Sequence, residues 1–234
     1  MIRLITYLAP SIPADLFRLV ARHIEERCGV PVSLDFETRI SGPLEGDDDP
    51  FADGRADVGF VCAPSYRWMR GRVSLLPALV PLDPRANGRP VYFSDVVVPA
   101  DSDVRTFDQL RGRRWAYNDR NSRSGWFSML ERIGGDESFF SELFQAGSHL
   151  QSLAAVRGGR VDGAAIDSNT LFMQAHDDLR IVETWGPFPI QPVIVRNGVK
   201  SDCIAEALLN IHEQHDLSPF GFARFASVTA ADYE

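Results

Sequence analysis

The chain has 234 residues, of which 44% are hydrophobic and 24% charged, and these values are ordinary for a folded globular protein. They exclude a disordered or low-complexity chain. With 24 Lys and Arg against 32 Asp and Glu, the net charge is −8, so the chain lacks the basic surplus typical of nucleic-acid binders.

Apolar periodicity alternates between strand-like and helix-like segments from the first residues onward. We expect strands at residues 2–7, 32–38, 58–62, 73–82, 91–99, 114–117, 140–145, 161–167, 179–184 and 191–196. We expect helices at residues 14–27, 107–112, 125–133, 150–157, 169–176 and 202–215, and Gly29 is a typical terminator of the first. Strands that alternate with helices predict an α/β fold with a parallel sheet.

Two strand-like segments, at residues 92–99 and 184–193, are flanked by Pro, Gly or polar residues. Between them lies a complete βαβ set. Two crossovers around an inserted domain would give two lobes with a cleft between them. One continuous sheet of about eight strands fits the same pattern and is the alternative.

Cysteine usage and the lack of long apolar segments predict a compartment. Cys28, Cys62 and Cys203 are odd in number, widely spaced and without a CxxC pair, which indicates a reducing compartment and no disulfide framework. No segment approaches the ~18–20 apolar residues of a membrane helix, so no membrane insertion is expected. The first residues lack the apolar core and cleavage site of a secretory signal. The sequence as it stands therefore predicts a cytoplasmic protein, and a periplasmic location would require a leader.

The segment YNDRNSRSG, residues 117–125, lies between a predicted strand and a predicted helix. Ser122, Ser124 and Gly125 place hydroxyl and backbone N–H groups at a helix start, where unpaired donors and the helix dipole hold anions. Arg123 adds a cation for a charge-assisted contact. Simple N-capping explains the same serines without a ligand.

Three further positions follow predicted strands. Residues 147–149 read Gly-Ser-His before a helix, so His149 is expected to be neutral and able to donate one hydrogen bond. Asp167 ends a strand and either faces a ligand or caps the next helix. Ser65 and Tyr66 follow the strand at 58–62. In an open parallel sheet such turns lie at the carboxyl edge, where ligands bind.

The chain contains none of the common enzyme signatures GxSxG, HExxH, GxGxxG and CxxC, and no pair of carboxylates spaced for acid–base chemistry. His212 and His215 are three residues apart but have no matching Cys or His cluster. No catalytic residue, metal or cofactor is therefore expected.

Taken together, these segments resemble the phosphate-, phosphite- and phosphonate-binding proteins of ABC transporters, the PhnD-like group of the type 2 periplasmic-binding-protein fold. The matching segments are ADVGFVCAPSY (56–66), YFSDVVVPADSDVRTFDQLRGRRWAYNDRNSRSG (92–125), GSHLQSLAAVRGGRVDGAAIDS (147–168) and WGPFPIQPVIV (185–195). The resemblance implies an α/β fold of two lobes joined by two hinge strands, with a ligand cleft between the lobes. Residues 1–94 plus 190–234 would form lobe 1, and residues 95–189 would form the inserted lobe 2.

The resemblance also implies a function, namely non-enzymatic binding of a small oxyanion such as a phosphonate, phosphite or phosphate. The chain would be the substrate-binding component of an ABC uptake system with a permease as partner, or a co-opted sensor. Carried over by position, Ser122, Arg123, Ser124, Gly125 and His149 would hold the anion. Asp167 would face its substituent, and Tyr66 with Ser65 would contribute from lobe 1. The family usually has a small hydroxyl residue where this chain has Arg123.

Two other classes of function share this fold. The first is an enzyme similar to menaquinone-pathway or thiamine-pyrimidine-synthase proteins, which would need a His, Lys or carboxylate dyad aimed into the cleft. The second is the effector-sensing domain of a regulator, which would need a DNA-binding partner. A site that presents only hydrogen-bond donors favours binding over catalysis.

Overall fold

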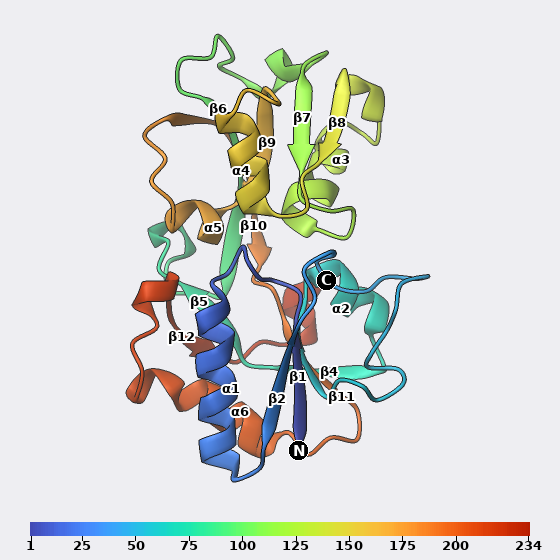
Figure 1. The fold of residues 1–234 in the computed structure, drawn as a ribbon, viewed down its shortest axis with the longest axis vertical. Helices are drawn as coiled ribbons and strands as arrows, with labels where there is room; N and C mark the ends of the chain where they lie inside the picture. Colours follow the sequence, from blue (N-terminus) through green and yellow to red (C-terminus); the bar gives the residue numbers. More distant parts are fainter. The chain divides into compact units, whose positions relative to one another are not determined.

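The computed structural model describes residues 1–234, which divide into two compact units (Figure 1). Unit 1 comprises Met1–Val91 and Pro189–Glu234, and unit 2 comprises Tyr92–Phe188. Each unit has its own five-stranded sheet, so the alternative of one continuous sheet is wrong and the α/β fold class is confirmed.

The main sheet of unit 1 is mixed rather than fully parallel. Its strand order is β2 (Val32–Phe36), β1 (Ile2–Thr6), β3 (Val58–Phe60), β11 (Val193–Arg196) and β4 (Val73–Leu76). The first three strands are parallel, and β11 runs antiparallel to both of its neighbours. A separate two-stranded sheet pairs β5 (Ala78–Pro81) with β12 (Phe222–Ala226).

The helices of unit 1 are α1 (Ala14–Cys28), α2 (Ala63–Met69) and α6 (Asp202–Asn210). Helix α1 buries its apolar face against the sheet, and its Phe17 ring contacts the rings of Phe36 and Phe60. The helix ends at Gly29, whose φ of 64° is left-handed, as expected from the sequence. Helices α1 and α6 pack against each other (Figure 1).

Unit 2 is built on a sheet with the strand order β10 (Leu179–Pro189), β6 (Val91–Pro99), β9 (Gly163–Asp167), β7 (Arg114–Tyr117) and β8 (Glu142–Gln145). Strand β7 is parallel to β8 and β9, whereas β6 is antiparallel to β9. The helical segments are a π-helix at Arg123–Phe127, α3 (Ser128–Arg132), α4 (His149–Arg157) and α5 (Ser168–Phe172). One core cluster is aromatic, around Trp115 and Phe107, and the other is aliphatic, around Leu153 and Ile166.

Each unit fixes the starts of its parallel strands with an Arg–Asp pair. In unit 1, the backbone N–H and guanidinium of Arg3 donate to Asp57, which also accepts from Arg196. In unit 2, Arg114 donates to Asp162 through the same two groups. Burial alone would raise the pKa of Asp57, but the arginine hydrogen bonds outweigh it and lower that pKa to about 2. The carboxylate therefore stays charged and holds three strands in register.

Several predicted elements have different bounds. The strand expected at 73–82 is two strands, β4 and β5, because Pro77 lies between them and offers no N–H to a ladder. The helix expected at 169–176 ends at Phe172, and the one at 202–215 becomes a 3₁₀ turn (Ile211–Glu213) after α6. Residues 63–66, expected as a turn, begin α2, and β12 was not predicted. No helix is both long and apolar enough to cross a membrane.

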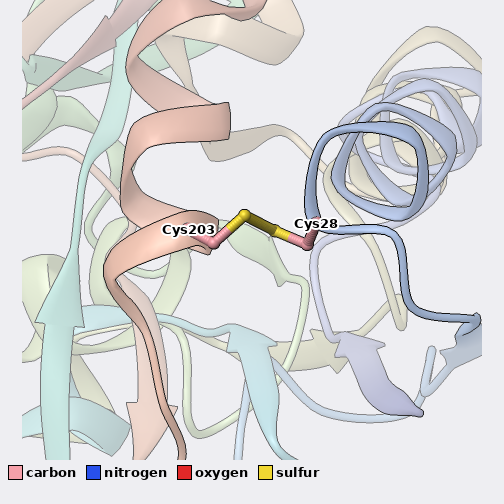
Figure 2. Close-up of a disulfide and its surroundings, with 2 residues drawn as sticks. All are labelled: Cys28 and Cys203. Atoms are coloured by element: carbon pink, nitrogen blue, oxygen red, sulfur yellow. A yellow bond between two sulfur atoms is a disulfide. The ribbon is translucent and has the colours of Figure 1, made fainter.

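The prediction that the cysteines form no disulfide is wrong. Cys28, the last residue of α1, is bonded to Cys203 in the first turn of α6 (Figure 2). The packing of these helices brings the two Cα atoms to 5.8 Å, well within disulfide range. The two residues are 175 positions apart, so their spacing in the sequence carries no sign of this contact. Cys62 is buried and is not part of a disulfide.

Candidate functional site

Two strand-to-helix turns lie side by side in unit 2. Strands β7 and β8 are parallel neighbours that end together, with Tyr117 opposite Gln145. Beyond the strands, the backbone N–H of Gly147 donates to the carbonyl of Asn118 at 2.8 Å. The turns at 118–122 and 146–148 are therefore joined by hydrogen bonds, as expected for the carboxyl edge of a parallel sheet.

A buried serine–histidine pair lies where these two turns meet. The Ser124 Oγ is 3.0 Å from the His149 Nε2, and the two residues are only 2% and 4% exposed. Strand β6 supports the pair, because the Ser94 hydroxyl donates to the Ser124 carbonyl at 2.9 Å. Which of the two side chains donates depends on the imidazole tautomer. The structure thus brings together two residues predicted from separate segments.

The other two serines of these turns cap helices. The Ser122 Oγ accepts from the Gly125 N–H at 3.1 Å, and the Ser148 Oγ accepts from the Gln151 N–H at 3.2 Å. The capping interpretation is thus confirmed for Ser122, whereas Ser124 pairs with His149 instead. A capping oxygen acts as an acceptor, so the O–H of each capping serine is still able to donate a hydrogen bond to an anion.

Gly125 lies in a space that admits no larger residue. A Cβ atom at this position would be 1.9 Å from the Asn118 Oδ1 and 3.3 Å from the His149 Cε1. Asn118 is itself oriented by a hydrogen bond from its Nδ2 to Asp119, which in turn accepts from the Asn121 N–H. The glycine lets the helix start approach the histidine closely.

The helix that follows the first turn starts as a π-helix rather than an α-helix. The backbone N–H groups of Trp126 and Phe127 both donate to the carbonyl of Ser122, at 3.2 and 3.0 Å. Helix α4 begins at His149. Two helical N-termini, each with a partial positive charge, are therefore next to the Ser124–His149 pair.

His149 is neutral at physiological pH. Burial lowers its pKa to about 4, and an interaction with the backbone of Ala165 opposes this only in part. The sequence also predicted a neutral histidine, but from the helix terminus, whereas burial is the dominant cause.

The Arg123 side chain is held by two other groups. Its Nη2 donates to Glu131 at 2.9 Å, and its guanidinium carbon lies 4.4 Å from the centre of the Phe188 ring. Only 14% of the side chain is exposed. The guanidinium is thus engaged by a carboxylate and an aromatic ring, and its contact with an anion stays a prediction.

Asp167 is the last residue of β9, which pairs with β6 on one side and with β7 on the other. It caps α5 by accepting from the Asn169 N–H at 2.8 Å, and it is 4% exposed. In the β6–β9 ladder it is opposite Ser94, whose hydroxyl holds the Ser124 carbonyl. The capping alternative is confirmed, and the position is also close to the candidate site.

Ser65 and Tyr66 belong to unit 1, on α2. The Ser65 hydroxyl is buried without a hydrogen-bond partner, next to Gly42. The Tyr66 ring packs edge-on against Tyr233, with 5.2 Å between ring centres. The site in unit 2 is built without these two residues.

Sequence reasoning missed two supporting residues of the site. Asn118 lies inside the segment that was singled out, but nothing in the sequence distinguishes it as the residue that packs against Gly125. Ser94 lies within a strand otherwise read only as apolar, and a single buried serine in a strand is a weak signal. Its role follows from the β6–β9 pairing, which periodicity does not reveal.

A serine hydrogen-bonded to a histidine also occurs in the active sites of hydrolases, where the histidine acts as a general base. A general base works best with a pKa near the operating pH, and the His149 pKa of about 4 is far below it. No carboxylate contributes to the His149 pKa as an orienting partner would. No three His, Cys, Asp or Glu side chains form a group that could hold a metal ion. The arrangement suits anion binding better than nucleophilic catalysis.

A family model described as "ABC transporter, phosphonate, periplasmic substrate-binding protein" matches residues 4–233 of the chain. The match covers both units, and it supports binding rather than the enzyme alternative.

Solved structures of low sequence identity share the fold. PhnD1 from Prochlorococcus marinus, in complex with methylphosphonate, has a TM-score of 0.81 at 14% identity, over 100% of this chain and 94% of the other. A binding component of a phosphonate ABC transporter from Pseudomonas aeruginosa has a TM-score of 0.77 at 15% identity, over 99% and 82%. A Xanthomonas citri protein bound to ATP has a TM-score of 0.70 at 18% identity, over 99% and 92%.

Proposed function

The chain belongs to the phosphonate-binding family of periplasmic ABC-transporter substrate-binding proteins, and from this premise we propose that it binds a small phosphorus oxyanion at Ser122–Gly125 and His149. The ligand class is that of methylphosphonate, phosphite or phosphate. The proposed role is the capture of this anion for an ABC permease, without chemical change.

The observation that carries the proposal is the buried Ser124–His149 pair at the start of two helices. A protein with a net charge of −8 repels an anion at long range, so local groups must provide the attraction. Helix N-termini supply partial positive charge and N–H donors, and the serines supply hydroxyl hydrogens. Burial strengthens each of these interactions, because little water competes for the anion.

The other residues of the proposed site contribute in different ways. Gly125 permits the close approach of the backbone, and Asp167 selects the substituent on the anion. Arg123 contributes through its backbone and through the position of its turn, since its guanidinium contacts Glu131 and Phe188. Ser65 and Tyr66 are the proposed contributions of unit 1, with the unpartnered Ser65 hydroxyl as the stronger candidate.

The Cys28–Cys203 disulfide supports an oxidising compartment, which is where such bonds persist. The matching family is described as periplasmic, and the proposed location of this chain is therefore the periplasm.

Replacing Ser124 tests the site. A hydrogen bond to a charged oxygen contributes roughly 1.5–3 kcal/mol, so Ser124→Ala should weaken binding by about 10- to 150-fold. Isothermal titration calorimetry with methylphosphonate, phosphite, phosphate and sulfate measures the loss. Ser141→Ala is the matched control, because Ser141 is an exposed serine of the same unit. If the Ser124→Ala, His149→Ala double variant kept full affinity, the pocket would lie elsewhere.

Asp167 should act on selectivity rather than on overall affinity. Asp167→Asn keeps a residue that caps helices equally well but removes the negative charge. A carboxylate attracts an ammonium group and repels a phosphonate, so the variant should prefer phosphate over aminomethylphosphonate by roughly tenfold more than the wild type does. Competition titrations give the ratio. Equal changes for both ligands would assign Asp167 a structural role only.

A further inference from the structure

A separate polar pocket lies within unit 1, at the ends of β1 and β2. Its volume is about 650 Å³. Ile5 and Asp35 are register partners on the two strands, and the Glu37 N–H continues the ladder to the Thr6 carbonyl. Because side chains alternate along strands, Ile5, Tyr7, Asp35 and Glu37 share one face of the sheet, and all four line the pocket.

The pocket has an excess of negative charge. Its lining includes four carboxylates and two arginines, a balance of 2 − 4 = −2. Arg39 pairs with Glu37, and Arg55 pairs with Asp48. The Asp35 carboxylate is exposed and forms no ion pair or hydrogen bond within the protein. The arginines therefore leave at least one carboxylate at the pocket available to a ligand.

The Tyr7 hydroxyl is a second and independent sign of a ligand. Tyr7 is 5% exposed and lines the pocket, and its hydroxyl makes no hydrogen bond within the protein. The ring is held in place by burial while the hydroxyl keeps its hydrogen-bonding capacity for a ligand in the pocket. Burial, followed by Glu37 and the neighbouring aspartates, raises the Tyr7 pKa, so the hydroxyl stays protonated and its oxygen can accept a hydrogen bond.

We propose that this pocket binds a primary alkylammonium group, which donates to the Asp35 carboxylate and to the Tyr7 hydroxyl oxygen. Both partners are acceptors, so the cation must carry N–H groups, and a quaternary ammonium does not fit. The carboxylates do not converge on one point as metal ligands do, which excludes a bare divalent ion as the better occupant. Ile5 and Ile40 offer apolar surface for the alkyl stem.

The test compares n-butylammonium with 1-butanol, which has nearly the same shape but no charge. Binding to the full chain is measured by calorimetry at constant ionic strength, without any oxyanion present. The anion site of unit 2 is then not involved, so a failed anion proposal leaves this test intact. Butylammonium should bind and 1-butanol should not.

Two variants test the two proposed contacts of the ammonium group one at a time. Asp35→Asn should weaken butylammonium binding by about 10-fold or more, and Tyr7→Phe by about 10-fold. Asp101→Asn removes an equal charge from an exposed position in unit 2 and should change nothing. Asp35 is exposed, so its replacement should leave the fold intact, which circular dichroism checks. Equal binding of butylammonium and 1-butanol, or equal affinities of Asp35→Asn and Asp101→Asn, would overturn the proposal.

Discussion

Loss of the Cys28–Cys203 disulfide should lower the free energy of unfolding by about 3–5 kcal/mol. The bond closes a loop between residues 175 positions apart, and an unfolded chain loses much conformational entropy when so long a loop is closed. In the folded state the bond joins the end of α1 to the start of α6 (Figure 2). The Cys28→Ser, Cys203→Ser variant should therefore melt roughly 6–20 °C below the wild type.

A reducing agent provides the control for this experiment. It should lower the melting temperature of the wild type towards that of the double variant and leave the variant unchanged. Thiol titration of the unfolded, unreduced wild type should count one thiol, that of Cys62. A count of three would show that the bond does not form in the purified protein.

The disulfide also shows what a sequence pattern cannot supply. Apolar periodicity predicted the helices that contain Cys28 and Cys203, and the structure has α1 and α6 at these places. It gave no information on whether the two helices pack together, because that depends on the order of strands between them. Cysteine number and spacing therefore led to the wrong expectation that no disulfide forms.

The candidate site was more predictable, for a local reason. Ser122–Gly125 and residues 147–149 each follow a strand, and neighbouring parallel strands bring such turns together. Only the strand order was missing, and β7 and β8 are adjacent. Support from Ser94 depends on the antiparallel β6–β9 pairing and could not be predicted in this way.

The contacts of the Arg123 side chain were not predicted from the sequence, for a different reason. Its position in the anion turn suggested a direct charge contact, yet its guanidinium lies against Phe188, which is 65 residues later in the chain. Glu131, the other partner, is eight residues later, beyond the three or four residues over which helical side chains normally pair, so periodicity did not indicate this contact either. The competing contacts of a long side chain are set by the fold around it.

The stability of the protein should fall between pH 6.5 and pH 4 because of His149. Its pKa is about 4 in the folded protein, where burial disfavours the charged ring, against an ordinary value of 6.5. Between these two values the unfolded chain binds more protons than the folded one, so acid favours unfolding. A difference of 2.5 pKa units corresponds to about 3 kcal/mol, of which about 2 kcal/mol is lost by pH 5.

A variant isolates this contribution from the other acid-sensitive groups. The pKa of the buried His23 is also lowered, chiefly by burial, so the wild type alone does not separate the two histidines. His149→Gln removes the titrating ring, and its free energy of unfolding should fall less than that of the wild type between pH 7.5 and pH 5, by about 2 kcal/mol. Parallel pH profiles for the two proteins would contradict the assignment to His149.

The same histidine should link oxyanion binding to proton uptake. A bound anion beside the Ser124–His149 pair favours the imidazolium and raises the His149 pKa, whereas the free protein keeps the ring neutral down to about pH 4. At pH 5 the binding of methylphosphonate should therefore take up a proton. Calorimetry in two buffers of different ionisation enthalpy measures this uptake as a difference in binding enthalpy. His149→Gln should bind more weakly and show a smaller difference between the buffers. If the wild type and His149→Gln took up protons equally, His149 would not be the group that senses the anion, and the protonation would belong to the ligand.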